Sequence, residues 1–312
     1  TFAVIAPEDA ELIAATLINK FHGDPSLFDE GRTMIAERTG RPCLGPVAHF
    51  AHAHRLPAED VLGLEVPQAD AGETIIAVPR LERIANFDDL DPLKREPGVK
   101  LVIVQPGEAI PRDAKLVILP GSKATRSDLA FLKAQGWDID ISAHVRAGGH
   151  VLGICGGFQM LGKSVADPDG LEGTSGTTEG LGLLDVDTVL GPQKELCVES
   201  ATDAISGLSL TGYHMHMGVT TGADTSRAFA HVDGATEGAR SATGRVMGTY
   251  LHGLFSADQF RRDFLARLDI KTDPLFDFEA DIEKTLDDLA AHIETHVDVD
   301  ALIALAREPV LP

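Results

Sequence analysis

The chain has 312 residues, of which 44% are hydrophobic, and its 27 basic and 48 acidic residues give a formal net charge of −21. This composition is typical of a soluble globular protein of about two domains, large enough to fold without disulfides or structural metals. The negative charge argues against nucleic acid and anionic membrane surfaces as partners. Cys43, Cys155 and Cys197 are too few and too scattered for a disulfide framework or a zinc site, which favours a reducing compartment.

Neither a membrane span nor a signal peptide is predicted. No apolar run approaches the roughly 20 residues that cross a bilayer, and the N-terminus lacks the basic start and small-residue cleavage site of a secretory signal. We therefore expect a cytoplasmic protein. The sequence opens with Thr1 and runs directly into a helix start at Pro7, so we interpret it as part of a longer chain.

The start of the chain alternates between helix and strand signals. A short helix beginning at Pro7 precedes an expected strand over 16–19. Ser26 is predicted to cap a second helix that ends at Gly40, and a strand is expected over 42–47. This alternation indicates an α/β fold.

A linker and a second domain are predicted next. Residues 57–72 are rich in Pro, Gly and scattered acids, as linkers are. The second domain is expected to span 73–312, and apolar residues at near-helical spacing over 282–305 predict one or two closing helices. Short Val- and Ile-rich runs predict strands of a parallel sheet buried on both faces, at 73–79, 99–104, 116–119 and 151–154. The predicted fold class is again α/β.

The sequence around Cys155 has the pattern of a nucleophile elbow. An apolar strand ends at Ile154, Gly156 and Gly157 follow the cysteine, and a helical pattern comes next. Glycine permits the tight turn that presents a side chain at the carboxyl end of a strand. The N-terminus of the next helix favours the thiolate. The flanking pattern makes a merely buried structural cysteine the weaker interpretation.

A thiolate that attacks a carbonyl carbon creates an oxyanion, which needs hydrogen-bond donors already in place. We predict the backbone N–H groups of Gly156, next to the nucleophile, and of Gly121, after the strand at 116–119. His252 is the predicted general base, because a short apolar strand ends there and Gly253 follows. No carboxylate lies within four residues on its C-terminal side, so a Cys-His dyad is the simpler interpretation.

The other histidines have simpler explanations. His49, His52 and His54 have no acidic or cysteine partner nearby in the sequence, which favours solvated loop residues, and we predict no metal site. His214 and His216 alternate as on a strand and should share one face. The pattern leaves pocket lining and a structural role equally open for this pair.

Two segments now carry a family resemblance. Gly-Ile-Cys-Gly-Gly-Phe-Gln at 153–159 and Gly-Thr-Tyr-Leu-His-Gly-Leu-Phe at 248–255 resemble the class I glutamine amidotransferase domain of the cobyrinic and cobyric acid synthase group. Ile-Asn-Lys-Phe-His-Gly-Asp-Pro-Ser at 18–26 narrows the resemblance to its cobyric acid synthase branch. Further stretches agree at 37–40, 44–45, 86–92, 119–123, 128–130, 135–137, 179–183 and 212–218. The resemblance spans nearly the whole chain.

The resemblance implies an ATP- and glutamine-dependent amidoligase of the cobalamin pathway. Glutamine would be hydrolysed at Cys155 with His252 as the base. The ammonia would amidate peripheral carboxylates of a corrinoid, adenosylcobyrinic acid a,c-diamide, after their activation by ATP and Mg²⁺. Gln159 and Gly157 would bind glutamine, and Asn19 would lie near the nucleotide. The glutaminase domain itself would hold no cofactor.

The resemblance also implies a domain organisation. Residues 1–56 would be the rear part of a dethiobiotin synthetase-like P-loop domain, and 73–312 a doubly wound glutamine amidotransferase domain with C-terminal helices. The family begins with a phosphate loop ending in Gly-Lys-Ser or Gly-Lys-Thr, and we identify no such loop here. We therefore expect no ATP-dependent amidation by this chain alone.

Two alternatives remain open at the level of sequence. One is an amidase that acts on cobyrinic acid itself or on a cell-wall lipid precursor. The other is a non-enzymatic remnant that serves as a scaffold or a partner-binding domain. The oligomeric state does not follow from the sequence.

Overall fold

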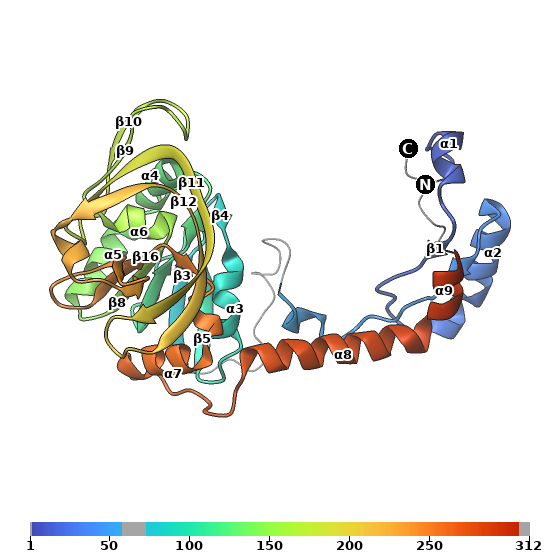
Figure 1. Ribbon diagram of the computed structural model, residues 1–312. Helices are drawn as coiled ribbons and strands as arrows, with labels where there is room; N and C mark the ends of the chain where they lie inside the picture. Colours follow the sequence, from blue (N-terminus) through green and yellow to red (C-terminus); the bar gives the residue numbers. More distant parts are fainter. Residues whose placement is uncertain (1, 58–72, 306–312) are drawn as a thin grey trace. The chain divides into compact units, whose positions relative to one another are not determined.

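The computed structural model describes residues 2–57 and 73–305, so the predicted linker lies outside the described residues except for its first position. The chain divides into two compact units (Figure 1). One comprises Thr1–Leu56 with Ala280–Pro312 and is called the terminal unit below. The other, Pro57–Glu279, is called the central unit.

The terminal unit contains the short elements predicted at the start of the chain. Helix α1 (Pro7–Glu11) precedes strand β1 (Thr16–Leu17), which pairs in parallel with β2 (Cys43–Leu44). Helix α2 (Asp29–Thr39) lies between the two strands in the sequence and ends at Gly40. The φ of 65° at Gly40 is the left-handed conformation in which glycine commonly terminates helices.

The prediction that Ser26 caps the second helix is wrong. A 3₁₀ turn, η1 (Pro25–Phe28), precedes α2, and Asp24 is its cap. The Asp24 carboxylate accepts the Ser26 N–H at 3.0 Å and the Ser26 hydroxyl at 2.8 Å. Asp caps helices as well as Ser does, and the Asp directly before Pro25 is the residue with extended backbone.

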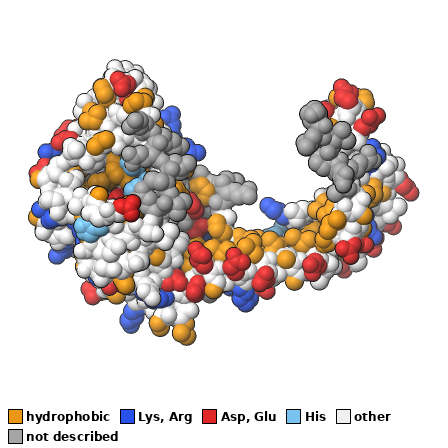
Figure 2. All heavy atoms as spheres, viewed as in Figure 1, with side chains coloured by type: hydrophobic (Ala, Val, Ile, Leu, Met, Phe, Trp, Pro, Cys, Tyr) orange, Lys and Arg blue, Asp and Glu red, His pale blue; other side chains and the backbone are white. Residues whose placement is uncertain are grey.

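Two helices close the described part of the chain, as the periodicity predicts: α8 (Phe278–His296) and α9 (Val299–Leu305). Figure 2 shows hydrophobic side chains along one side of α8. Leu286 and Ile293, two apolar residues of α8, are 43% and 38% exposed. Within the described residues, no helix has both the length and the apolar composition needed to cross a membrane.

From Ala280 onward, α8 packs with the terminal unit and not with the predicted second domain. His292 Nε2 lies 2.8 Å from the carbonyl oxygen of Ala48, and Asp281 lies 4.0 Å from the guanidinium of Arg55. The predicted boundary at residue 312 therefore differs from the division in the structure. Helical periodicity shows which face of a helix is apolar, but not which domain that face contacts.

The central unit is built on a six-stranded sheet with the order β15-β16-β8-β6-β3-β5. All neighbouring strands are parallel except β15 and β16. The four predicted strands are confirmed as β3 (Thr74–Pro79), β5 (Val99–Val104), β6 (Leu116–Leu119) and β8 (His150–Ile154). The other two are β15 (Ala239–Arg240) and β16 (Val246–Thr249). Because β16 pairs with β8, the segment before His252 lies beside the strand before Cys155.

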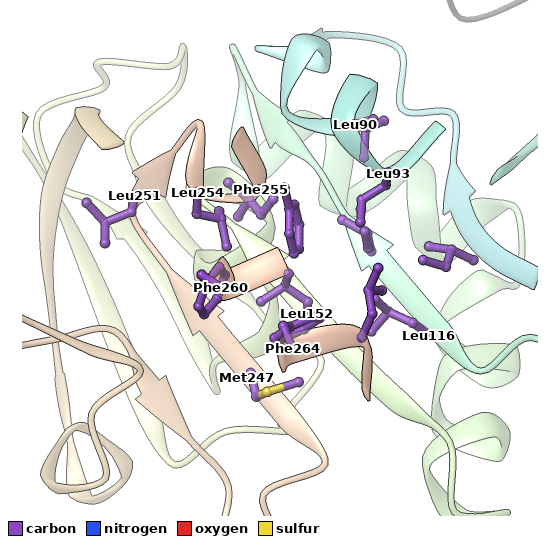
Figure 3. Packing of buried hydrophobic residues seen from close by; sticks show 14 of the residues in the cluster. Leu90, Leu93, Leu116, Leu152, Met247, Leu251, Leu254, Phe255, Phe260 and Phe264 are labelled. Atoms are coloured by element: carbon purple, nitrogen blue, oxygen red, sulfur yellow. The ribbon is translucent and has the colours of Figure 1, made fainter. Parts of the chain in front are cut away.

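Alternating side chains of this sheet enter two separate cores. Ile76 and Val78 of β3 lie in one core and Ala77 lies in the other. Figure 3 shows the first core, in which Leu116 and Leu152 of the sheet pack in one cluster with the rings of Phe260 and Phe264. The first core includes side chains of the helices α3 (Asp91–Lys94) and α7 (Asp258–Arg267). The second includes side chains of α4 (Thr125–Ala134), α5 (Trp137–Arg146) and α6 (Gly156–Leu161). Helices on both faces confirm the doubly wound α/β prediction.

A second sheet, of seven strands, does not follow from the sequence analysis. Its strands are β9 (Ser164–Asp167), β10 (Gly176–Glu179), β11 (Val186–Asp203), β12 (Ser209–Gly222), β13 (Ala230–Val232), β14 (Ala235–Glu237) and β17 (Leu251–His252). Many of its residues are polar, so it lacks the continuous apolar runs that reveal buried strands. The pairing of β17 with β12 sets His252 opposite Tyr213.

A buried ion pair anchors the start of α7. Arg261 and Glu96 are both 0% exposed, and Arg261 Nε lies 2.9 Å from Glu96 Oε2. Arg261 also donates to the carbonyl of Phe255, three residues after His252, at 2.8 Å. The pair therefore supports the backbone that follows the predicted base.

Arg261→Met should strongly destabilise the central unit, because it leaves the Glu96 carboxylate buried without its cation. We expect a loss of about 3 to 5 kcal/mol in the free energy of unfolding, measured by urea denaturation. Lys163→Met is the matched control, since Lys163 is half exposed in its own ion pair and its loss should leave the urea midpoint nearly unchanged. Similar midpoints for both variants would contradict the importance of the buried pair.

Candidate active site

Cys155 lies at a sharp turn between β8 and helix α6 (Gly156–Leu161), as expected for a nucleophile elbow. Its φ of 52° and ψ of −111° are uncommon for a residue that is not glycine. The glycines allow α6 to fold back closely. A Cβ on Gly153 would lie 2.6 Å from the backbone of Gly157, and one on Gly157 would lie 2.0 Å from the carbonyl oxygen of Leu119. Larger residues at these two positions would prevent the turn.

The turn presents Cys155 to a pocket of about 370 Å³. His252 lies in the wall of the same pocket, so the structure brings the predicted nucleophile and the predicted base together. The rest of the wall comprises Ala85, Asn86, Ser122, Lys123, Gln159, Glu172 and residues 215–217. The elbow, the segment at Ser122 and Lys123 that follows β6, and the long strand β12 therefore meet at one site.

A carboxylate orients the His252 ring, so the prediction of a dyad without an acid is wrong. His252 Nδ1 lies 2.7 Å from Asp89 Oδ2, and Asp89 Oδ1 accepts the N–H of Gly253 at 2.6 Å. Both side chains are buried, at 1% and 4% exposure. Asp89 lies in the 3₁₀ turn η4 (Phe87–Leu90), 163 residues before His252. Asp89 is too far from His252 in the sequence to be recognised as its partner, although segment 86–92 is part of the family resemblance.

The charge state of His252 follows from these neighbours. Burial favours the neutral imidazole, but the Asp89 carboxylate and the sulfur of Cys155 outweigh it and raise the pKa of His252 to about 10. Nε2 is buried and has no hydrogen-bond partner among the residues that the structure describes, while the Cys155 thiol donates to the Met215 carbonyl at 3.5 Å. The imidazole can therefore hold a proton on the side that faces the pocket.

Tyr213 fixes the plane of the same ring. Its aromatic ring stacks on His252 with a centroid distance of 5.2 Å and an angle of 23° between the planes. The Tyr213 hydroxyl accepts a hydrogen bond from Asn86 Nδ2 at 3.0 Å. Burial, together with the negative charges of Asp89 and Asp88, raises the pKa of Tyr213 far above its ordinary value, so the phenol remains neutral. Burial and the charge of Asp89 also raise the pKa of Asp88.

The backbone pairing at Gly121 bears on the predicted oxyanion hole. Strand β7 (Gly121–Ser122) pairs antiparallel with β4 (Ile84–Ala85), and the Lys123 N–H donates to the Arg83 carbonyl at 2.9 Å. Hydrogen-bonded positions alternate along an antiparallel ladder, so this register directs the Gly121 N–H toward β4. The geometry therefore does not support Gly121 as an oxyanion donor.

Ser122 offers a backbone amide beside Gly156. In the same register its N–H points away from β4. The Ser122 nitrogen lies 3.0 Å from the place that a Cβ on Gly156 would occupy, so this amide adjoins that of Gly156, the other predicted donor. Gly121 has a different use: a Cβ there would lie 3.3 Å from Cε1 of His252, so glycine leaves room for the imidazole.

The predicted glutamine contacts are only partly supported. Gln159 lines the pocket, but Thr125 Oγ1 donates to its Oε1 at 2.9 Å, and its Nε2 lies 3.1 Å from the Met217 carbonyl and 3.3 Å from the Tyr250 hydroxyl. These bonds tie β12 to the elbow and occupy the amide. Gly157 is absent from the pocket wall, because it packs against β6 instead.

The two histidines on β12 share one face, as predicted, and their rings contact each other edge to face at 5.5 Å. His216 lines the pocket and stacks on Tyr250 with a centroid distance of 3.8 Å. His214 is 8% exposed and lies 4.0 Å from Glu237. The structure thus gives His216 the pocket position and His214 a buried structural one.

The remaining predicted residues lie in the terminal unit. Asn19 follows β1, and its side chain accepts the backbone N–H of the next residue at 2.8 Å; its role in nucleotide binding stays a prediction. His49, His52 and His54 are exposed. Among the described residues, no group of three or more His, Cys, Asp or Glu side chains is placed to hold a metal ion.

Contrary to the expectation from the sequence, one segment does have the residue pattern of a phosphate loop. Residues 157–164 have the spacing Gly-x₄-Gly-Lys-Ser of such a loop. Most of this segment, however, forms the buried helix α6, and Lys163 is paired with Asp185 at 2.7 Å and Asp187 at 3.4 Å. A phosphate loop instead presents free backbone N–H groups ahead of a helix. The pattern is therefore not a phosphate site.

A family comparison covers the whole of this site. The model of the CobB/CobQ-like glutamine amidotransferase domain matches residues 75–260, which include Asp89, Cys155 and His252. The chain belongs to the CobB/CobQ-like glutamine amidotransferase family. The resemblance seen in the sequence is thereby confirmed.

Curated members of the family extend the comparison. Cobyric acid synthase of Rhodobacter capsulatus is 59% identical over 307 residues, 98% of this chain and 63% of that protein. Those of Cereibacter sphaeroides and Bradyrhizobium diazoefficiens are 57% and 56% identical, over 98% and 97% of this chain and 63% of each relative. The chain thus spans less than two thirds of these relatives. Among solved structures, PurLQS of Thermotoga maritima aligns with a TM-score of 0.47 and 15% identity over 63% of this chain and 98% of that one.

Proposed function

We propose that this chain is the glutamine-hydrolysing part of a cobyric acid synthase, with Cys155 as nucleophile, His252 as base and Asp89 as the residue that orients the base. The observation that carries the proposal is the meeting of Cys155 and His252 at one pocket, with Asp89 bonded to His252 and the cysteine held at a positive φ. A family member that had lost its chemistry would not need to retain this strained turn or the buried carboxylate.

The first half of the reaction follows from the geometry. His252 Nε2 takes the proton of the Cys155 thiol, and the sulfur forms a bond to the side-chain amide carbon of glutamine. The charge that develops on the amide oxygen is stabilised by the backbone N–H groups of Gly156 and Ser122. His252 then gives its proton to the departing nitrogen, the carbon–nitrogen bond breaks, and ammonia leaves a γ-glutamyl thioester on Cys155.

The second half regenerates the enzyme. A water molecule attacks the thioester carbon while His252 accepts one of its protons. The carbon–sulfur bond breaks, glutamate is released, and the sulfur leaves as thiolate beside the imidazolium. Asp89 holds the ring in one tautomer throughout and stabilises its positive charge, as the raised pKa of His252 reflects.

The ammonia would serve the amidation of peripheral carboxylates of a corrinoid, adenosylcobyrinic acid a,c-diamide, in the cytoplasm. The cobyric acid synthases at 56 to 59% identity support this substrate over cobyrinic acid or a cell-wall lipid precursor. That amidation needs ATP and Mg²⁺. The residues that the structure describes include no phosphate loop of the required geometry and do not fit a triphosphate, so we derive no step through ATP.

His252→Ala tests the base directly. We expect the rate of glutamine hydrolysis to fall by at least about 10²-fold, because the thiol loses its proton acceptor and the leaving nitrogen its donor. The rate is measured as glutamate released, and the exposed His231→Ala serves as the matched control that should retain wild-type turnover. A wild-type rate in the His252 variant would exclude it as the base.

Covalent labelling tests the proposed function as a whole. The chain is treated with 6-diazo-5-oxo-L-norleucine, a glutamine analogue that alkylates nucleophiles able to attack the glutamine amide carbon. Mass spectrometry should find the adduct on Cys155, not on the buried free thiol of Cys43, and glutamine should slow its formation. Absence of labelling at Cys155 would overturn the proposal and favour the non-enzymatic alternative.

A further inference from the structure

Two oppositely charged side chains line the pocket without a role in the chemistry described above. They are Lys123 and Glu172. None of the ion pairs among the described residues involves either side chain, so within that part of the chain the two charges pair neither with each other nor with a neighbour. Charges of both signs at one pocket suit a small zwitterion.

The backbone of Lys123 is fixed next to the proposed oxyanion donor Ser122. It follows Ser122 directly, and its own N–H donates to the Arg83 carbonyl at 2.9 Å. Its side chain is exposed toward the pocket side of this turn. In a chain with a formal charge of −21, a carboxylate ligand is repelled at long range and needs a local cation for binding. Lys123 is such a cation.

Glu172 is held more firmly, in the segment between β9 and β10. Its Oε2 accepts the backbone N–H of Arg126 at 3.0 Å, and its own N–H donates to the buried Asp167 carboxylate at 2.9 Å. The Arg126 guanidinium, 3.6 Å from Asp167, ties the same segment to helix α4. One carboxylate oxygen of Glu172 thus fixes the side chain, and the other has no hydrogen bond among the described residues.

The geometry points to Lys123 and Glu172 as the residues that bind the α-carboxylate and the α-ammonium group of glutamine. This inference rests on the proposed function. Glutamine carries both charges on one carbon, three bonds from the amide carbon that Cys155 attacks. Charge-assisted hydrogen bonds to both groups would place that amide carbon at the sulfur, and would reject amides that lack either charge.

The test pairs each variant with a substrate that lacks the matching charge. Glu172→Gln and Lys123→Gln are assayed on glutamine, on 5-amino-5-oxopentanoate, which has no ammonium group, and on 4-aminobutanamide, which has no carboxylate. Where an analogue is hydrolysed too slowly, its Ki against glutamine hydrolysis replaces its KM. The exposed residues Glu179 and Lys100 provide the matched controls Glu179→Gln and Lys100→Gln.

Each variant should raise the KM for glutamine by about 10-fold or more, with little change in kcat. Glu172→Gln should leave the constant for 5-amino-5-oxopentanoate unchanged, and Lys123→Gln that for 4-aminobutanamide. A wild-type KM for glutamine in both variants, or an equal loss on all three compounds, would overturn the inference while labelling of Cys155 left the proposed function intact. A wild-type chain that neither hydrolyses nor binds any of them would overturn both.

Discussion

Replacing Cys155 with Ala is expected to abolish glutamine hydrolysis, with turnover falling by about 10⁴-fold or more. In the proposed mechanism this thiol forms the covalent intermediate, and no other described cysteine lines the pocket. The measurement is glutamate release under saturating glutamine. Cys43→Ala, which removes a buried thiol of the terminal unit, should retain the wild-type rate.

The same variant separates hydrolysis from amidation. In a full-length chain that joins this sequence to the remaining third of a cobyric acid synthase, Cys155→Ala should lose glutamine-dependent amidation. Amidation with added ammonia should survive, because the thiol takes no part in that step. Equal loss of both activities would show that Cys155 supports the fold or the synthetase reaction and not glutamine hydrolysis.

Asp89→Asn should lower kcat by about 10³- to 10⁴-fold with a smaller change in KM. The carboxylate accepts a bond from His252 and another from the Gly253 N–H, so an amide in its place disfavours the reactive tautomer and the imidazolium. Asp88→Asn is the matched control, because Asp88 adjoins Asp89 without bonding to His252 and should retain activity within a few-fold. If the two variants behave alike, Asp89 has no special role.

The Asp89 variant should also change how stability depends on pH. The pKa of His252 is raised from 6.5 to about 10 in the folded chain, so folding favours the protonated ring. This contribution to the free energy of unfolding is complete below about pH 6.5 and is lost as the pH rises through about 10. The difference in urea midpoint between wild type and Asp89→Asn should therefore be largest near pH 6.5 and shrink toward pH 10. A constant difference across this range would contradict the pKa shift.

Local features of the sequence were sufficient for the elbow and the parallel sheet. The strand before Cys155 is a continuous apolar run and the two glycines after it leave few alternatives to a tight turn, so nearest neighbours in the chain determine both. His252 is likewise marked by its immediate neighbours, because it ends a short apolar strand and Gly253 follows it. Their separation in the sequence was no objection to a shared site, because catalytic partners meet in space. In the structure they meet because β16, just before His252, pairs with β8, just before Cys155.

Other parts of the site depend on contacts between residues that are far apart in the sequence. Asp89 reaches His252 across 163 residues. The identity of the second oxyanion amide depends on the register of β4 and β7, in which a shift of one residue turns an N–H to the other side. Gln159 appeared to be a ligand for glutamine, but its hydrogen-bonding groups are taken up by neighbours from three other segments.

The sequence by itself therefore determined the α/β class and the family, and it singled out Cys155 and His252 as the proposed nucleophile and base. Each of these follows from short segments, in which neighbouring residues largely set the local backbone conformation. Only the tertiary structure revealed the contact of Asp89 with His252, the Ser122 amide beside Gly156, the packing of α8 with the terminal unit and the presence of Lys123 and Glu172 in one pocket. Those features arise when distant segments bury surface against one another, and the strength of hydrogen bonds and charges depends on that burial.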